Sequence, residues 1–339
     1  METASPDTTA KPLVCVILGQ TASGKSTLCH NIAKRIDSEI ISMDALKVYR
    51  GMDIGTAKAS PADQQAVPHH LLDLAAPSES FNVARYLDDL EGVIRDVLNR
   101  GHLPLIDCGT PLYLKTFLSG MLESPEPDEE LRAELETMSS TALHRRLATL
   151  DPEAAATLHA NDRKRVIRAV QYAMQTGKPI SAERTQFETR RTDYRFVLTG
   201  PLWDEAILRA RIEQRVERMM TAGLIDEVVR IHNGEGFSKT AREAIGYRQL
   251  LEHLEGAYSL EEAVEKIKRR TWQLARKQMV WFKRYRDVKW LQVKSDEELM
   301  RAAIFLAGEL AGEVRASMKG APPEPRREPR LDGLYHKSR

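Results

Sequence analysis

The chain has 339 residues, of which 29% are charged, and its 50 Lys and Arg against 49 Asp and Glu give a formal net charge of +1. This length predicts a sizeable core and a second, smaller domain, and the balanced charge excludes a global field that attracts nucleic acid. The cysteines Cys15, Cys29 and Cys108 have no metal-ligand spacing, which excludes a disulfide framework or a zinc site. No apolar run is long enough to cross a bilayer and residues 1–12 hold no signal-peptide stretch, so we expect a cytoplasmic protein without a membrane partner.

The first predicted element is a buried strand over Leu13–Leu18, which leads directly into a glycine-rich loop. This loop matches G-x-x-x-x-G-K-[ST] and consists of Gly19, Gln20, Thr21, Ala22, Ser23, Gly24, Lys25 and Ser26. Where such a loop joins a strand to a helix, predicted here over about 27–36, its backbone N–H groups and the helix N-terminus face an anion. The pattern therefore predicts a phosphate site in which Lys25 adds a mobile charge and Ser26 holds Mg²⁺.

Two further strands are predicted to bring polar groups to the same edge of a sheet. Glu39–Met43 ends at Asp44, and Leu103–Ile106 ends shortly before Thr110, with helical periodicity over Ala84–Asn99 between them. Ligands bind at the carboxyl ends of strands in open α/β sheets, so we expect Asp44 and Thr110 to converge with the phosphate loop. Asp44 can ligate Mg²⁺ through water, take a proton, or accept the N–H groups of a turn. Thr110 can cap the next helix or donate to a bridging phosphate oxygen.

The character of the chain changes from Pro125 to about Arg191, where helical stretches such as Asp128–Met138 and Asp162–Met174 occur without a predicted strand. A core strand returns at 194–199, followed by amphipathic helices from Trp203 to His232 and from Leu260 to Arg286. We therefore expect a P-loop NTPase-like α/β fold, a parallel sheet flanked by helices with an inserted all-helical subdomain. The predicted parts are a disordered tail over 1–11, a core over 12–122 and 193–318, a helical insertion over 123–192, and a disordered tail over 319–339.

Basic residues concentrate in two places. Lys266 to Lys289 contains ten Lys or Arg and a single acid, interleaved with aromatic residues, which favours docking of a polyanion. Lys164, Arg165 and Arg168 share neighbouring positions of a predicted helix, and this face suits nucleic-acid phosphates or is simply solvated. Arg211 and Arg215 are four residues apart and can either point into the cleft or pair with nearby glutamates.

Taken together, these segments resemble the tRNA dimethylallyltransferase (IPP transferase) family over roughly residues 13–292. Segments in family order carry the resemblance: 19–26, 48–58, 67–73, Gly109-Thr110 with Leu112-Tyr113, Asn161-Asp162 with Arg165, Arg168 and Ala169, 246–249, and Trp281-Phe282. The resemblance implies a monomer that transfers a dimethylallyl group from dimethylallyl diphosphate, with Mg²⁺, to the N6 amine of adenosine 37, 3′ of the anticodon in tRNA. The bound partner is then the anticodon stem-loop.

The resemblance also implies residue roles. The loop, Arg211 and Arg215 bind the diphosphate, Lys25 stabilises its departure, Asp44 takes the proton of the amine, and Thr110 lies beside the reacting centre. By family position the tRNA contacts are Asp44, Ala45, Leu46, Lys47, Thr110, Arg132, Lys164, Arg165, Val166, Ile167, Arg168, Glu243, Ala244, Ile245, Gly246, Tyr247, Arg248, Arg276, Lys277, Gln278, Trp281 and Lys283.

The chain departs from the family pattern mainly around the predicted base. Ala45 and Lys47 stand where Ser and often Gln are usual, and Asp107-Cys108 stands where an apolar residue and Gly are usual. We hypothesise that Lys47 keeps Asp44 ionised or meets a tRNA phosphate. The alternatives left open are a free adenine-nucleotide (cytokinin-type) isopentenyltransferase and a divergent tRNA-binding paralogue. Two alternative functions belong to other classes of protein: a small-molecule kinase and a non-catalytic RNA-binding module.

Overall fold

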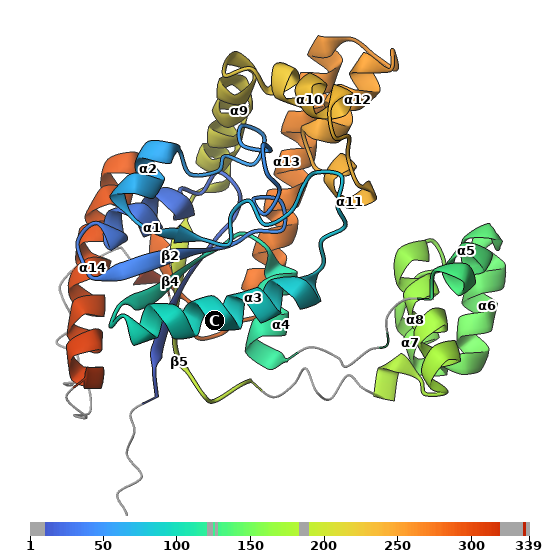
Figure 1. Ribbon diagram of the computed structural model, residues 1–339, viewed down its shortest axis with the longest axis horizontal. Helices are drawn as coiled ribbons and strands as arrows, with labels where there is room; N and C mark the ends of the chain where they lie inside the picture. The colour runs from blue at the N-terminus through green and yellow to red at the C-terminus, as the bar shows by residue number, and fades with distance from the viewer. Residues whose placement is uncertain (1–10, 121–124, 126–127, 183–189, 319–334, 337–339) are drawn as a thin grey trace, which may run out of the picture. The chain divides into compact units, whose positions relative to one another are not determined.

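The computed structural model describes residues 11–120, 125, 128–182, 190–318 and 335–336. Within these residues seven strands form one sheet in the order β3-β2-β4-β1-β5-β6-β7 (Figure 1). The strands in chain order are β1 (Leu13–Leu18), β2 (Ser38–Met43), β3 (His69–His70), β4 (Leu103–Cys108), β5 (Arg195–Leu202), β6 (Lys289–Gln292) and β7 (Tyr335–His336). All neighbouring strands pair in parallel except β6 and β7, which are antiparallel. The predicted parallel α/β sheet is confirmed.

The phosphate loop lies at the middle of the sheet because β1 pairs with β4 on one side and with β5 on the other. Every residue of β1, β2 and β4 is buried. Parallel strands with both faces covered are built from near-continuous apolar runs, and for this reason the sequence predicted β1 and β2.

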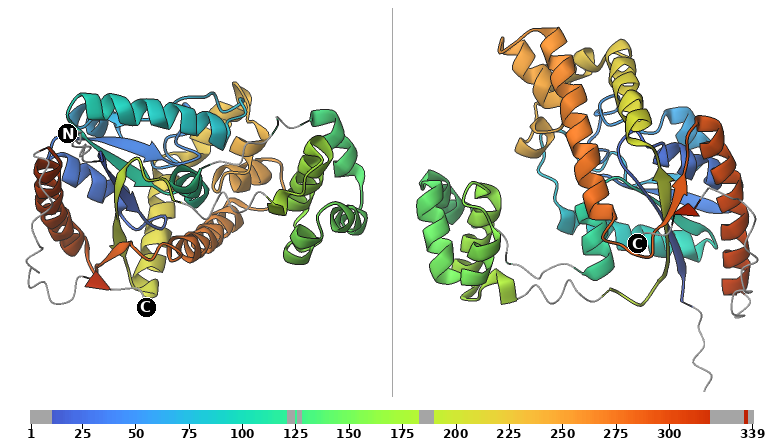
Figure 2. Two further views of the ribbon diagram at one scale, coloured as in Figure 1. Left: turned by 90° about the horizontal axis from the view of Figure 1, so that it is seen from below. Right: turned by 180° about the vertical axis from the view of Figure 1, so that it is seen from behind.

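Helices cover both faces of this sheet. On one face α1 (Lys25–Ala33) and α14 (Asp296–Met318) pack together and share the main hydrophobic core with Cys15 and Ile17 of β1. On the other, α3 (Val83–Asn99) lies against β2 and β4 (Figures 1 and 2). The buried residues of α3 recur at helical spacing, at positions 86, 90, 94 and 97, and Asn82 caps its first turn. A single amphipathic stripe thus fixes how this helix docks.

The remaining helices before α5 (Glu129–Thr137) and after β5 are α2 (Pro61–Ala66), α4 (Pro111–Ser119), α9 (Glu205–Thr221), α10 (Leu224–Asn233), α11 (Lys239–Arg242), α12 (Tyr247–Leu254) and α13 (Leu260–Phe282). Gly223, with a left-handed φ of 91°, separates α9 from α10. Helix α13 contacts both α9 and α12 (Figure 2). No helix among the described residues is both long and apolar enough to span a membrane.

The chain divides into two compact units, one formed by residues 1–114 and 192–339 and the other by Lys115–Arg191. The second unit holds α5 (Glu129–Thr137), α6 (Ser140–Leu150), α7 (Pro152–Thr157) and α8 (Arg163–Thr176). It has its own hydrophobic core, in which Leu135 and Leu147 pack with Val166 and Val170. No strand occurs among its described residues.

Two expectations about the elements need correction. Strand β4 continues to Cys108, so Asp107 is a strand residue, paired with Ile17 on one side and Ser42 on the other. The C-terminal tail was expected to be disordered throughout, whereas Tyr335–His336 form β7 against β6. The rest of the predicted tails lies outside the described residues, apart from Lys11.

Candidate active site

The phosphate loop connects β1 to α1 through two residues with left-handed backbone, Ala22 (φ 61°) and Gly24 (φ 80°). Such a change of handedness turns successive N–H groups toward one side and forms an anion-binding concavity. Helix α1 begins at Lys25, so its positive end adds to the same site. Gly24 is required sterically as well, because a Cβ there would lie 2.6 Å from Leu299 Cδ2. The local geometry is that of the predicted phosphate cradle.

Two side chains from beyond β5 brace the outside of this loop. Trp203 Nε1 donates to the backbone oxygen of Ser23 at 2.8 Å, and Arg211 Nε donates to that of Ala22 at 3.0 Å. The guanidinium of Arg211 also pairs with Asp296 at 2.7 Å and stacks on the Trp203 ring. Arg211 is not among the described residues that line the cavity below the loop. We therefore reassign Arg211 from the diphosphate to the support of the loop.

Gln278 of α13 ties the loop to the end of β4. Its Oε1 accepts the Thr21 N–H at 2.8 Å, and its Nε2 donates to the Gly109 oxygen at 2.7 Å. Both ends of this buried amide are used inside the protein, so Gln278 positions the loop and is not the predicted tRNA contact. Sequence reasoning missed this role, as it missed Trp203, because the partners lie 257 and 180 residues away.

Asp44 and Thr110 meet where β2 and β4 end, as predicted. The Ala45 N–H donates to Thr110 Oγ1 at 3.0 Å, and the Leu46 N–H donates to Asp44 Oδ1 at 2.9 Å. One carboxylate oxygen of Asp44 thus serves a turn, which was one of the three roles open to it. Because the Thr110 hydroxyl accepts from Ala45, its own proton remains available for donation.

The second oxygen of Asp44 converges with Lys25 over Gly109. A Cβ placed on Gly109 would lie 2.9 Å from Asp44 Oδ2 and 3.4 Å from Lys25 Nζ. Asp44, Lys25 and Arg215 line one cavity together with apolar side chains, among them Val216. Burial lowers the pKa of Lys25, although the Asp107 carboxylate counteracts part of this shift. The cavity therefore combines a carboxylate, two cations and an apolar wall.

The hydroxyl predicted to hold Mg²⁺ is engaged within the protein. Ser26 Oγ donates to Asp107 Oδ2 at 2.6 Å. Lys47 Nζ lies 3.1 Å from the same carboxylate oxygen and 3.3 Å from Ser26 Oγ. A cation therefore already lies beside this hydroxyl, so the residues present do not fit a divalent ion at Ser26, and we derive no step through Mg²⁺. Lys47 is paired with Asp107 and only 6% exposed, and its hypothesised contact with a tRNA phosphate stays a prediction.

Glu227 of α10 holds the family segment 53–55 in place. Its two oxygens accept the N–H groups of Asp53, Ile54 and Gly55 at 3.0, 2.9 and 3.2 Å, and the hydroxyl of Tyr247 at 2.6 Å. Tyr247 is fully buried, so its side chain supports this segment. The predicted contact of this side chain with tRNA is therefore wrong. Sequence reasoning missed Glu227, since one glutamate on an amphipathic helix carries no distinguishing signal.

A second polar cluster lies outside the cavity, at the start of β2. Glu39 accepts a bidentate pair from Arg100 at 2.8 Å and contacts His70 at 2.6 Å and His102 at 2.7 Å. The hydrogen bonds from Arg100 and the two imidazoles outweigh the effect of burial and lower the pKa of Glu39 to about 2. No group of three or more metal-ligating side chains occurs among the described residues. His70 and His102 therefore hold the Glu39 carboxylate.

The predicted tRNA contacts separate into buried and exposed residues. The buried ones are Lys47, Val166, Ile167, Ala244, Gly246, Tyr247 and Gln278. For Val166 and Ile167, which belong to the core of the second unit, a side-chain contact with tRNA is wrong, because a helix in a core turns every third or fourth residue inward. Lys47, Gly246 and Gln278 line the cavity that also contains Asp44. Lys164, Arg165, Glu243, Arg248, Arg276, Lys277 and Lys283 are exposed. Ala45, Leu46, Thr110, Arg132, Ile245 and Trp281 are partly exposed, as are Asp44 and Arg168.

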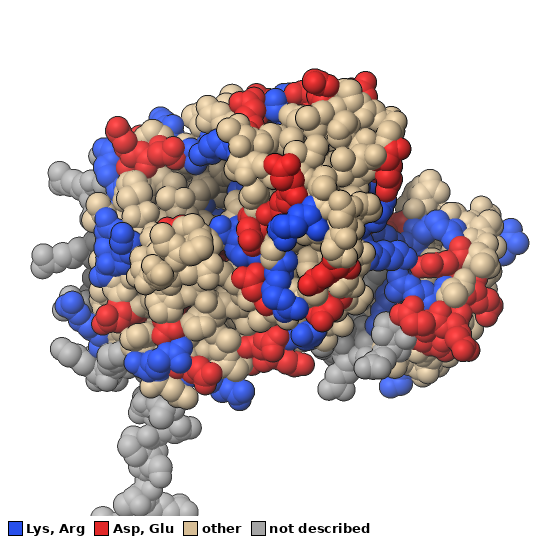
Figure 3. Space-filling model, turned by 45° about the horizontal axis from the view of Figure 1, so that its top comes forward, with Lys and Arg blue, Asp and Glu red and all other residues tan. Residues whose placement is uncertain are grey.

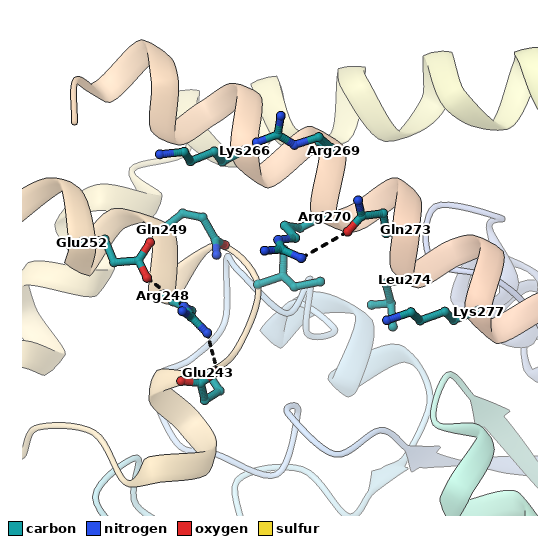
Figure 4. A pocket seen from close by; sticks show the side chains of 11 residues that line it. Glu243, Arg248, Gln249, Glu252, Lys266, Arg269, Arg270, Gln273, Leu274 and Lys277 are labelled. Carbon is teal, nitrogen blue, oxygen red and sulfur yellow. Dashed lines mark hydrogen bonds and ion pairs between the residues drawn. The ribbon is translucent and has the colours of Figure 1, made fainter. Parts of the chain in front are cut away.

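A surface pocket of about 350 Å³ lies between α12 and the basic face of α13 (Figure 4). The basic side chains that line it are Arg248, Lys266, Arg269, Arg270 and Lys277. Its two acids, Glu243 and Glu252, are both paired with Arg248, at 2.7 and 2.8 Å. Figure 3, which brings this end of the core forward, shows charges of both signs interleaved there. The other four cations of the pocket belong to the basic run of residues 266–289 noted in the sequence.

A phosphate loop that faces a carboxylate at the carboxyl edge of a parallel sheet defines a P-loop protein with the means to act on a phosphorylated substrate. The family model described as IPP transferase matches residues 47–285. The chain belongs to this family and is a transferase. A tRNA dimethylallyltransferase of Geobacter metallireducens is 40% identical over 288 residues, which cover 83% of this chain and 93% of the relative. One of Thermoanaerobacter is 40% identical over 88% of this chain and 98% of the relative.

Solved structures agree with this assignment. The tRNA isopentenylpyrophosphate transferase of Bacillus halodurans is similar with a TM-score of 0.64 and 36% identity, over 91% of this chain and 98% of that one. A eukaryotic dimethylallyltransferase described as acting on tRNA shares the fold, with a TM-score of 0.76 and 24% identity over 94% of this chain and 82% of that one.

Proposed function

We propose that this chain transfers a dimethylallyl group from dimethylallyl diphosphate to N6 of adenosine 37, 3′ of the anticodon in tRNA, and releases pyrophosphate. The observation that carries the proposal is the convergence of Asp44 Oδ2 and Lys25 Nζ over Gly109, beside the phosphate loop. A group that can take a proton and a group that can neutralise a diphosphate thus lie next to each other, both in contact with the position of Gly109. The tRNA dimethylallyltransferase names of its relatives support the same reaction.

Each part of the reaction has a residue suited to it. The allylic C–O bond breaks and a C–N bond forms, while N6 gives up one proton. Lys25, the loop N–H groups and Arg215 stabilise the charge that develops on the departing diphosphate. Asp44 takes the proton of the amine. Thr110 keeps a hydroxyl proton that it can donate to a substrate oxygen.

We further propose that the anticodon stem-loop binds to the basic face of α13. The pocket of Figure 4 offers cations for backbone phosphates, and an adenine has to leave the anticodon stack before its N6 can reach Asp44. In the second unit, Lys164 and Arg165 are exposed on α8 and are suited by themselves to RNA phosphates. Arg165 is held toward Asp162 at 3.3 Å, an exposed pair that an RNA phosphate can replace at little cost.

The setting of the reaction is part of the proposal. We propose that the chain acts as a monomer, as the family resemblance implies. Cys15, Cys29 and Cys108 are all free thiols, which is consistent with a reducing cytoplasm. Mg²⁺ is given no ligand at Ser26, because the Ser26 hydroxyl is already engaged by Asp107 and lies beside the Lys47 ammonium.

The direct test is nucleoside mass spectrometry of tRNA incubated with the purified chain and dimethylallyl diphosphate, with AMP and ADP in parallel. We expect prenyl on the anticodon-loop adenosine, and a loss of at least about 100-fold in rate for Asp44→Asn, because proton transfer contributes at least that factor. Asp88→Asn on the exposed side of α3 is the matched control and keeps full activity. Prenyl on the free nucleotide would transfer the chain to the cytokinin-type class. Binding of tRNA without any transfer would identify a divergent paralogue.

The tRNA surface is tested separately by salt dependence. We expect Arg269→Ala with Lys277→Ala to weaken tRNA binding and to reduce the slope of log affinity against log salt by about one per lost phosphate contact. Arg95→Ala, an exposed cation on α3, is the control. An unchanged slope in the double variant would place the tRNA elsewhere.

A further inference from the structure

Lys47, Asp107 and Ser26 form a closed polar triangle at the first turn of α1. Asp107 Oδ2 accepts from Ser26 Oγ at 2.6 Å and from Lys47 Nζ at 3.1 Å, and the third side, from Nζ to Oγ, is 3.3 Å. Lys47 and Asp107 are 6% and 3% exposed. Two charges buried to this degree persist only when each neutralises the other. The ammonium is therefore a fixed cation and not a mobile surface charge.

The same ammonium reaches the reaction cavity. Lys47 and Ser26 both line it, together with Lys25 and Arg215. Three cations therefore line the cavity together with the carboxylate of Asp44, and the Asp107 carboxylate neutralises one of them, Lys47. A bound diphosphate meets an excess of positive charge there without any added ion.

A divalent ion and this ammonium compete for one position. Mg²⁺ on Ser26 Oγ requires ligand distances near 2 Å, and Lys47 Nζ is already 3.3 Å from that oxygen and bound to the nearest carboxylate. Two like charges this close to one oxygen repel strongly in a buried site. Burial disfavours both charged groups, yet the Lys47 and Lys25 ammonium groups lower the pKa of Asp107 to about 2. The carboxylate is therefore available to hold Lys47 at any physiological pH.

We propose that Lys47, held by Asp107, is the resident cation of the phosphate loop and binds the diphosphate in place of a divalent ion at Ser26. The inference rests on the proposed function for the identity of the organic diphosphate, but the ligand class, a diphosphate, follows from the cluster itself. It also explains two departures from the family pattern as one feature: Lys47 and Asp107 are 60 residues apart in sequence and in direct contact. Either residue alone would leave an unpaired buried charge.

The test is isothermal titration of the full-length chain with inorganic pyrophosphate, once in EDTA and once with excess Mg²⁺. We expect the wild type to bind in EDTA with an affinity within about threefold of that with Mg²⁺. The double variant Lys47→Gln/Asp107→Val removes both charges together and leaves no unpaired buried charge, and we expect its affinity in EDTA to fall by at least about tenfold. Lys34→Gln removes the same charge from an exposed site just after α1 and is the matched control.

Two results would overturn the inference: no pyrophosphate binding by the wild type in EDTA, or equal binding in EDTA by the wild type and the double variant. If the double variant fails to fold, judged by circular dichroism, the wild-type comparison decides alone. The outcome is separable from that of the proposed function. Prenyl transfer to tRNA with strictly metal-dependent pyrophosphate binding would refute this inference only, whereas metal-free binding through Lys47 without any prenyl transfer would refute the proposed function only.

Discussion

Replacing Gly109 by alanine should lower the rate of prenyl transfer while leaving the fold intact. The new Cβ would lie 2.9 Å from Asp44 Oδ2 and 3.2 Å from Lys25 Cε, against an ordinary contact of 3.4 Å or more. Asp44 cannot turn away freely, because its other oxygen accepts the Leu46 N–H at 2.9 Å. The carboxylate therefore has to retreat by about 0.5 Å, and a misplacement of about 1 Å can cost a factor of about 100. We expect kcat to fall by about tenfold.

The assay is single-turnover prenyl transfer at saturating dimethylallyl diphosphate, with thermal unfolding measured in parallel. Gly92→Ala is the matched control, since a Cβ at Gly92 in helix α3 meets nothing within 4 Å. That variant should keep full activity and gain up to about 1 kcal/mol in stability from its helix propensity. If Gly109→Ala keeps its rate within twofold of wild type, the convergence of Asp44 and Lys25 at this glycine does not position the chemistry.

Three further outcomes follow from the buried charges. Asp107→Ala should lower the free energy of unfolding, measured by urea titration, by about 3–5 kcal/mol, because it leaves a buried ammonium without its counter-charge. The double variant Lys47→Gln/Asp107→Val should stay within about 1 kcal/mol of wild type, and a double variant as unstable as the single one would refute the pairing. Glu227→Gln should lower the free energy of unfolding by about 2 kcal/mol, because it weakens several hydrogen bonds to one carboxylate. The exposed Glu235→Gln should leave the free energy of unfolding unchanged. Because the pKa of Glu39 is lowered to about 2 from 4.5, its contribution to the free energy of unfolding, on the order of 3 kcal/mol, is complete above pH 4.5 and lost as the pH falls toward 2. Unfolding titrations from pH 6 to pH 2 should therefore be less steep for Glu39→Gln, and identical slopes would contradict this account.

Local sequence patterns predicted the larger elements of the fold but missed the short strands. The apolar run of β1 and the helical periodicity of α3 extend over enough residues to show their period, and both elements were predicted to within one residue. β3 and β6 contain two and four residues, too few for any pattern to be recognised. The extension of β4 through Asp107 was missed for a different reason, because a carboxylate is unfavourable inside a buried strand until its counter-charge is known.

The sequence by itself determined the phosphate loop, the polar residues that follow β2 and β4, and the family, because these are properties of residues that are close together along the chain. Only the tertiary structure decided which cations serve the cavity and which serve the scaffold. Arg211 and Arg215 have the same side chain four residues apart, and one braces the loop through Ala22 while the other lines the cavity. The contact between Lys47 and Asp107 likewise requires β2 and β4 to be neighbours. Such side-chain pairings depend on chain segments that meet only after folding, so no local pattern encodes them.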